Sequence, residues 1–208
     1  DLLSDPANTL GVTVNTPANS NLFGALAGRA IHYVVVVCHP TSPADARPDY
    51  ALPTGRKVPR MQRGSEAPLW PDATTRYPAL LFSHGLGGSP LSNDYIAVMT
   101  TLASFGYVVA APFHTDAKVT DIKLTDFGDV LYMLTHFEEA VSMQAIRPLA
   151  LTATLDLLLA HPHWRERVDA AQVGGFGASL GGESLLLMAG AGLTTSIGQS
   201  WTPITRDP

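Results

Sequence analysis

The sequence predicts an α/β fold in which a mostly parallel sheet carries helices on both faces. Between residues 77 and 190, short runs of β-branched and small apolar residues alternate with stretches of helical periodicity. A glycine-rich turn, Gly177 to Gly181, joins the last of these runs to an apolar helix. Strand, helix and strand in that order imply parallel strands linked by right-handed crossovers.

The composition is that of one well-buried domain. The chain has 208 residues, of which 46% are hydrophobic and 15% charged, so we expect residues 1–208 to form a single globular domain. The formal net charge is −5 and no basic run occurs, which argues against a nucleic-acid partner. The longest uninterrupted apolar runs are too short for a membrane span.

Cys38 is the only cysteine, which excludes an internal disulfide. It falls in an apolar strand, so we expect a small core residue and not a reactive thiol. The sequence starts at Asp1 without Met or a signal sequence, and we expect an N-terminal segment to have been removed. The cellular location is not fixed, with secretion or a periplasmic site as the working expectation.

The N-terminal part is predicted to be largely irregular before the first central strand. Residues 1–30 are rich in Asn, Ser, Thr, Pro and Gly, with one short strand expected at Val12–Val14. Ile31–Cys38 is dense in β-branched residues and predicts a central strand. Seven prolines between Pro40 and Pro71 predict a long surface excursion without regular structure. Its aromatic residues, Tyr50 and Trp70, either line a site or pin the loop, and pinning is the default expectation.

The middle of the chain predicts a strand–helix–strand unit. The strands are Tyr77–Ser83 and Tyr107–Pro112, and the helix between them is Leu91–Ser104, stopped by Gly106. We expect Ile31–Cys38 to join the same sheet. It is also open to antiparallel pairing, because its connection contains no helix.

Two further helices are predicted before the last strand, Ala171–Phe176. The first is Asp126–His136, with one apolar face, inside a long connection over residues 115–144 that either caps a pocket as a lid or packs as a plain outer helix. The second is predicted to begin at Pro148, since proline is favoured at a first-turn position, and to end near His161.

Gly177-Ala178-Ser179-Leu180-Gly181 matches the G-x-S-x-G nucleophile elbow, in which a serine lies on a sharp turn between strand and helix. The purely structural alternative is that the glycines only allow a helix to pack closely on a sheet. A dinucleotide fingerprint is excluded by spacing, because its third glycine would fall at position 180, which is Leu180. We therefore expect Ser179 to be a catalytic nucleophile.

An acyl-transfer site also needs hydrogen-bond donors for the developing oxyanion, one of them from the loop after an earlier strand. His84-Gly85-Leu86-Gly87-Gly88 occupies that place after Tyr77–Ser83. We assign the two donors to the backbone N–H groups of Leu86 and Leu180. A plain glycine-rich turn is the alternative, and the presence of two such motifs at strand ends weighs against it.

These segments resemble α/β-hydrolases of the platelet-activating-factor acetylhydrolase and dienelactone-hydrolase-like group, which includes esterases and polyester hydrolases. The resemblance covers residues 31–40 and 77–192, about six-tenths of the chain. It implies the α/β-hydrolase fold and a serine nucleophile with oxyanion donors at Leu86 and Leu180. Separately, we expect no cofactor and no metal. Dienelactone hydrolases carry Cys at the nucleophile position, so Ser179 points to esterases. The segments that carry it are Tyr77–Gly87, Ser104–Ala110 and Gly175–Gly182.

The pattern departs from the family after Ser179. In this fold the acid and the histidine follow the serine, yet the remaining residues contain no His and only Glu183 and Asp207 as acids. Glu183 is interpreted as a structural partner of the elbow helix. We expect the C-terminal strands, the catalytic Asp and the His to lie beyond Pro208 or on a second polypeptide segment. His114, close to Asp116, is the other candidate base.

The sequence therefore predicts a serine carboxylesterase that acts through an acyl-enzyme on Ser179. Its substrate would be a small-molecule, lipid or polymer ester, with the acyl length and the oligomeric state left open. The alternative is a non-catalytic, hydrolase-like binding protein, because the general base is missing from its expected place. A nucleotide-binding protein is disfavoured by the absence of a G-K-[ST] motif.

Overall fold

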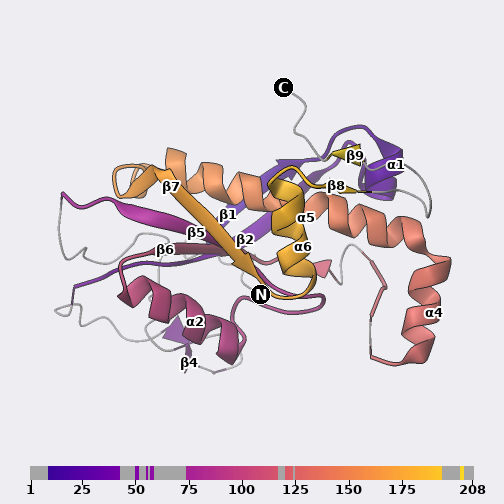
Figure 1. Cartoon of the computed structure of the whole chain (residues 1–208), viewed down its shortest axis with the longest axis horizontal. Coiled ribbons are helices and arrows are strands. Elements are labelled where there is room, and N and C mark those ends of the chain that lie inside the picture. The colour runs from indigo at the N-terminus through magenta and orange to yellow at the C-terminus, as the bar shows by residue number, and fades with distance from the viewer. Residues whose placement is uncertain are drawn as a thin grey trace.

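The computed structural model describes residues 9–42, 50–51, 55, 57–58, 74–116, 120–123, 125–193 and 202–203. A five-stranded sheet runs through the middle of this part of the chain, in the order β1-β2-β6-β5-β7 (Figure 1). The strands are β1 (Leu10–Asn15), β2 (Ala30–Cys38), β5 (Tyr77–Ser83), β6 (Val108–Pro112) and β7 (Val168–Gly177).

The parallel half of the sheet contains β5, which pairs with β6 on one side and with β7 on the other. The two strands that precede the predicted glycine-rich motifs therefore lie in one sheet, as the sequence predicts, and are neighbours in it. β2 runs antiparallel to β6 and β1 antiparallel to β2, which is the alternative left open for the first strand. The fold class, a mostly parallel sheet with helices, is confirmed.

Helices cover both faces of the sheet (Figure 1). On one face α2 (Asn93–Ser104) packs on β5 and β6 through a cluster that includes Phe82, Met99 and Val109. On the other face lie α1 (Ser20–Phe23), with the short 3-10 turn η3 (Gly24–Leu26) after it, and also α5 (Phe137–Ala160) and α6 (Leu180–Met188). Because both faces are covered, β6 is buried along its whole length.

The prediction that a helix begins at Pro148 is wrong. The helix α5 begins at Phe137 and continues through Pro148 without interruption. An internal proline removes one backbone hydrogen bond and costs roughly 3 kcal/mol. Residues 145–151 are all buried on the sheet and against neighbouring elements, and this packing outweighs that cost. The preceding helix, α4 (Phe127–Thr135), lies where the sequence predicts it.

Part of the proline-rich excursion is regular, contrary to expectation. Two short strands, β3 (Tyr50–Ala51) and β4 (Lys57–Val58), pair antiparallel. Another two-stranded pair forms from β8 (Gly192–Leu193) and β9 (Thr202–Pro203). Backbone pairing of two residues requires no apolar pattern, so composition could not reveal it. Most of the remaining excursion, Trp70 included, lies outside the described residues.

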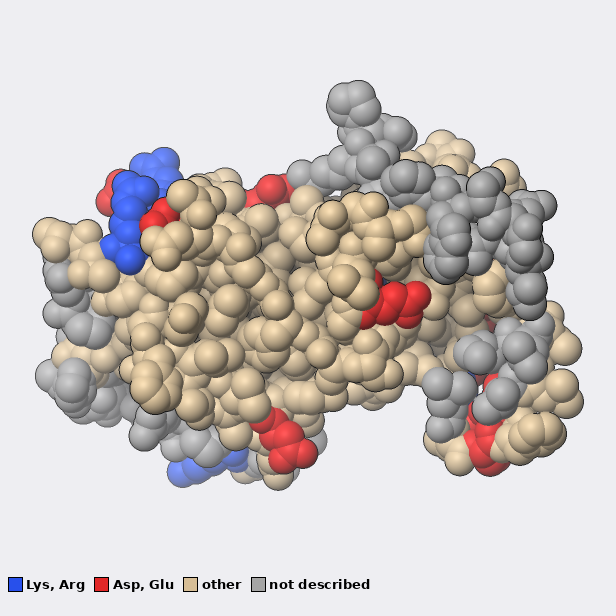
Figure 2. Space-filling view, viewed as in Figure 1, with Lys and Arg blue, Asp and Glu red and all other residues tan. Residues whose placement is uncertain are grey.

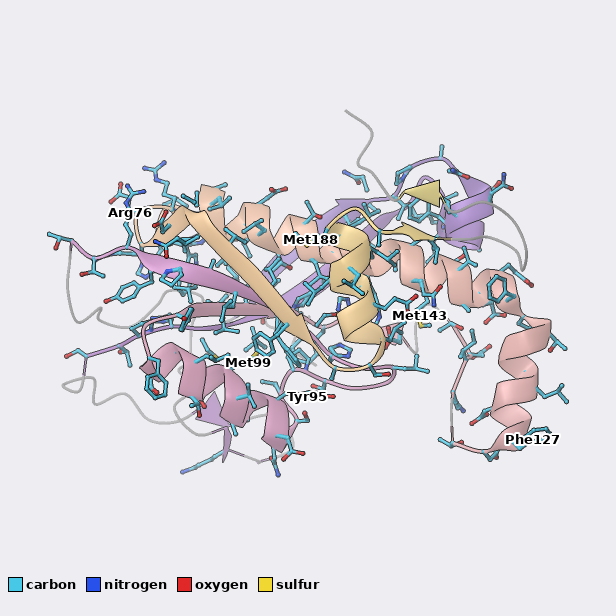
Figure 3. All side chains as sticks on the ribbon, viewed as in Figure 1. Arg76, Tyr95, Met99, Phe127, Met143 and Met188 are labelled. Carbon is cyan, nitrogen blue, oxygen red and sulfur yellow. The ribbon has the colours of Figure 1, made fainter. Side chains whose placement is uncertain are left out.

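Two apolar segments are less buried than their composition suggests. Leu186 on α6 is 65% exposed, and β7, which this helix contacts, is the outermost strand of the described sheet. On α4, Phe127 is 82% exposed and points away from the rest of the protein (Figure 3). Across the face that carries β7 and α6, charged side chains are few (Figure 2).

Among the described helices, α5 alone is long and apolar enough to cross a membrane, judged by length and composition only. Of its most apolar 18-residue stretch, 56% is buried inside the protein. Its burial on the sheet is that of a core helix.

Candidate active site

The strand β7 ends at Gly177, the helix α6 begins at Leu180, and Ser179 stands at the turn between them. Its backbone has φ 51° and ψ −124°, a conformation that L-residues rarely adopt. A residue held there stores about 1–3 kcal/mol of strain, which surrounding packing must maintain. The side chain of Ser179 is exposed. The strained strand-to-helix turn predicted from the sequence is therefore present.

Glycine is required on both sides of this serine by close backbone contacts. A Cβ on Gly177 would lie 2.4 Å from the carbonyl carbon of Gly181. A Cβ on Gly181 would lie 1.9 Å from the carbonyl oxygen of Ser83, at the end of β5. Neither position can hold a side chain without displacing backbone, so the first turn of α6 rests directly on the end of β5.

The loop that follows β5 reaches the turn that carries Ser179. The backbone N–H of Ala178 donates to the carbonyl oxygen of Ser83 at 3.1 Å. A Cβ built on Gly85 would lie 3.6 Å from the Cβ of Ser179. The two glycine-rich segments, about ninety residues apart in the sequence, are thus brought together at neighbouring strand ends.

The two predicted oxyanion donors belong to these two segments. Within the described part of the chain, neither the N–H of Leu86 nor that of Leu180 donates a hydrogen bond to another protein group. Leu180 is the first residue of α6, and the first N–H groups of a helix have no partner inside it. Both donors are accordingly available for an anion, and their role in binding one remains a prediction.

Buried polar side chains form hydrogen bonds at the loop that follows β5. His114 follows β6 and is 1% exposed; its Nε2 lies 2.8 Å from the hydroxyl oxygen of Ser83. The N–H of His114 donates to Nε2 of His84 at 3.1 Å, and Nδ1 of His84 lies 2.8 Å from the carbonyl oxygen of Gly85. These partners assign His84 the neutral tautomer with its proton on Nδ1.

The electrostatics of both imidazoles agree with that assignment. Burial lowers the pKa of His84, and the positive charge of Arg147 lowers it further, against the hydrogen bond to Gly85. For His114, nearly complete burial holds the pKa well below its usual value, with Arg147 and His84 acting in the same direction. Both rings are therefore neutral at neutral pH.

A buried ion pair lies beside these histidines. Arg147, on α5, donates from Nε and Nη2 to the carboxylate of Asp116 at 3.1 and 2.5 Å. The guanidinium also donates from Nη1 to the carbonyl oxygen of His84 at 2.7 Å. The carboxylate accepts the N–H of Gly87 at 3.0 Å. The side chain of Arg147 is fully buried, and its charge is paired with the carboxylate of Asp116 and bonded to a backbone oxygen of the loop.

Sequence reasoning placed His114 and Asp116 near the site but missed Arg147 and Ser83. Arg147 is the only charged residue between Ala140 and Leu155, an apolar stretch of α5. A lone charge among buried apolar residues must find a buried partner, and this signal was available in the sequence. No comparable signal exists for Ser83, because the sequence does not distinguish it from any other polar residue at the end of a strand.

No histidine of the chain hydrogen-bonds Ser179. All seven lie within the described residues, and His114, the candidate base, is bonded to Ser83 instead. Glu183, in the first turn of α6, has its pKa raised by partial burial, while Arg147 and a hydrogen bond from Gln144 lower it. Among the described residues, no group of three or more His, Cys, Asp or Glu side chains could hold a metal ion.

The fold of the described residues is the α/β-hydrolase fold. The profile of the family described as "Platelet-activating factor acetylhydrolase, isoform II" matches residues 58–126, which include β5, the loop after it and β6. The resemblance to the platelet-activating-factor acetylhydrolase and esterase-like group of α/β-hydrolases is thereby confirmed.

A solved structure shows the same fold, and a second is a weaker match. A ferulic acid esterase from Streptomyces cinnamoneus is 24% identical, with a TM-score of 0.57, over 87% of this chain and 54% of that one. The methylesterase BT1017 is 17% identical, with a TM-score of 0.41, over 90% of this chain and 34% of that one. The chain thus spans about half the length of the ferulic acid esterase. No curated protein matches the sequence.

Proposed function

We propose that this chain carries the nucleophile and the oxyanion hole of a serine ester hydrolase. The observation that carries the proposal is the conformation of Ser179, with φ 51° at an exposed strand-to-helix turn beside the loop after β5. Strained, exposed serines in this setting are typical of acyl-transfer enzymes. The family match and the esterase fold of the structural neighbour support ester hydrolysis as the general activity.

The chemistry follows from the groups at the turn. The hydroxyl of Ser179 attacks the ester carbonyl carbon, and the carbonyl oxygen becomes an oxyanion that accepts hydrogen bonds from the N–H groups of Leu86 and Leu180. The alkoxide leaves with a proton, and water then releases the acid and restores the serine. The positive end of the α6 dipole lies at the same place and favours the negative charge.

The general base is a histidine supplied from polypeptide outside these 208 residues. This part of the proposal is supported by the engagement of the described histidines with other groups. It applies to the natural polypeptide that contains these residues. The substrate is a carboxylic ester, and small-molecule, lipid and polyester substrates are distinguished by assay.

The test combines labelling with a substrate panel on that natural polypeptide. A fluorophosphonate should label Ser179, as read by peptide mass spectrometry. Ser179→Ala should abolish both labelling and the hydrolysis of acetyl, longer-chain, ferulate and polyester substrates while the protein stays folded. Labelling at another serine, with Ser179→Ala fully active, would contradict the assignment.

The absence of a histidine at Ser179 favours a second candidate, a hydrolase-like binding protein without a complete triad. In that case the natural polypeptide would neither react with the fluorophosphonate nor hydrolyse any ester in the panel. It would still bind ester-containing ligands, with an affinity that bulky substitution at Ser179 reduces.

A further inference from the structure

The ion pair of Arg147 and Asp116 is bonded to the backbone of a single loop. Arg147 donates to the carbonyl oxygens of His84 at 2.7 Å and of Gly85 at 3.4 Å. Asp116 accepts the N–H of Gly87 at 3.0 Å. Two buried side chains, from α5 and from the segment after β6, therefore hold three backbone groups of the loop that follows β5.

These contacts fix the direction of the backbone N–H group of Leu86. The carbonyl oxygen of Gly85 accepts from Nδ1 of His84 at 2.8 Å, from the N–H of Gly88 at 3.1 Å and from Arg147. In a planar trans peptide the C=O of one residue and the N–H of the next point in opposite directions. Donors gathered around the oxygen of Gly85 therefore turn the N–H of Leu86 away from the ion pair.

A need for stability alone does not explain a charged pair at this place. Removing two charges from water is unfavourable, and apolar residues of similar volume commonly stabilise a protein as well or better. The planar guanidinium fork can instead hold several acceptors in one fixed geometry, which a lysine or an apolar side chain cannot. Here two of those acceptors are loop carbonyls, and the loop itself packs against Ser179 through Gly85.

We propose that Arg147 and Asp116 are positioning residues for the oxyanion hole, which hold the loop after β5 so that the N–H of Leu86 faces the carbonyl attacked by Ser179. The inference rests on the proposed function, since an oxyanion must form for the donor to matter. Neither side chain touches the substrate. Both act through the backbone of the loop.

The expected effect is on kcat and not on KM. A donor aligned to the oxyanion interacts most strongly in the transition state, so its loss lowers the rate of the chemical step and leaves ground-state binding nearly unchanged. Removal of one oxyanion donor commonly lowers kcat about 10²-fold or more. Misalignment of the N–H of Leu86 should approach that figure.

The test uses three variants of the natural polypeptide and one matched control. Arg147→Lys keeps the charge and loses the fork, and Asp116→Asn keeps an acceptor for Gly87 and loses the charge. The double variant Arg147→Met with Asp116→Leu removes the pair without leaving an unpaired buried charge. Arg165, which is exposed and lies 3.9 Å from Glu166, supplies the control Arg165→Met.

Two readouts separate positioning from a merely structural role. The first is the split between kcat and KM, measured at a temperature where thermal unfolding shows each variant to be folded. The second is the infrared carbonyl stretch of an acyl-enzyme, which rises in frequency when hydrogen bonds to the carbonyl oxygen are lost. We expect a fall in kcat of at least tenfold, an unchanged KM and a raised stretch for the folded variants, with none of these changes for Arg165→Met.

The inference is overturned if a folded variant lacking the pair, the double variant above all, keeps the wild-type kcat and carbonyl stretch. Failure of the proposed function gives a different pattern, in which wild-type protein and Ser179→Ala are equally inactive and Ser179 is not labelled. That pattern overturns both ideas. Wild-type activity lost in Ser179→Ala but kept without the pair overturns only this one.

Discussion

The carbonyl oxygen of Ser83 occupies the space into which a side chain on Gly181 would project, 1.9 Å from an ideal Cβ. The same oxygen accepts the N–H of Ala178. The end of β5 and the first turn of α6 are therefore in backbone contact, and the conformation of the turn between them depends on that contact.

Gly181→Ala is expected to destabilise the protein severely, since its methyl group would meet backbone atoms of Ser83 and His84. Overpacking of this kind costs about 3 kcal/mol or more. The neighbouring Gly182→Ala meets nothing closer than 3.6 Å and should be neutral or gain up to about 1 kcal/mol from helix propensity. Urea unfolding of the two variants measures both effects. Equal stabilities would contradict the close contact.

Ser179→Gly is expected to be more stable than Ser179→Ala, although glycine is ordinarily the weaker residue beside a helix. At φ 51° and ψ −124° an alanine keeps the strain that glycine escapes. After allowance for the greater chain entropy of unfolded glycine, we expect a difference of about 1 kcal/mol in the free energy of unfolding. Chemical denaturation decides it, and a more stable alanine variant would show that the turn is unstrained.

The free energy of unfolding is expected to decrease as the pH is lowered through the ordinary range of histidine titration and below it. Burial lowers the pKa of His84 and His114 in the folded protein, so the unfolded chain binds more protons below about pH 6.5. The contribution of these two neutral rings to stability is therefore fully present above that pH. It is lost as the pH falls towards the folded-state pKa values. Each ring contributes at most about 1.4 kcal/mol per pH unit.

The measurement for this prediction is the free energy of unfolding between about pH 7 and about pH 5. His114→Asn should lower the number of protons taken up on unfolding by close to one, because it removes the more deeply buried ring. An unchanged slope in that variant would assign the pH dependence to other groups.

Cys38 is expected to be unreactive in the native protein. Its thiol is fully buried on β2, and burial raises its pKa to about 12, so almost no thiolate forms at neutral pH. A disulfide reagent such as dithionitrobenzoate should react at a rate set by unfolding, and rapidly in concentrated urea. Prompt reaction of the native protein would mean that β2 opens locally.

The sheet was predictable from the sequence because its strands carry strong and bounded patterns. β5 begins and ends at the predicted residues, since its apolar run is limited by polar residues on both sides. α5 was mispredicted because Pro148 is a strong local signal and the packing that overrides it is tertiary. The exposure of Leu186 likewise depends on which strand is outermost, a property of the sheet and not of the segment.

The glycine-rich halves of the site were predictable because each has a local motif at a strand end. The lone charge of Arg147 indicates that it has some buried partner, but the identity of its partners was not predictable, since Ser83, Asp116 and Arg147 come from three separate elements and form no sequence motif. Only folding places a helix residue next to a loop more than sixty positions earlier. The roles of Ser179, Leu86 and Leu180 stay predictions, because they depend on a substrate.

The pairing of β5 with β7 also has a consequence for the order of events during synthesis. β5 is made roughly ninety residues before the strand that pairs with its outer edge, and the backbone N–H and C=O groups of that edge have no strand partner in the interval. A ribosome adding about 5–20 residues per second needs several seconds to cross that gap. The serine turn can form only after β7 has been made, so the site is completed late in synthesis, and until then the unpaired edge of β5 is a place where another chain could pair.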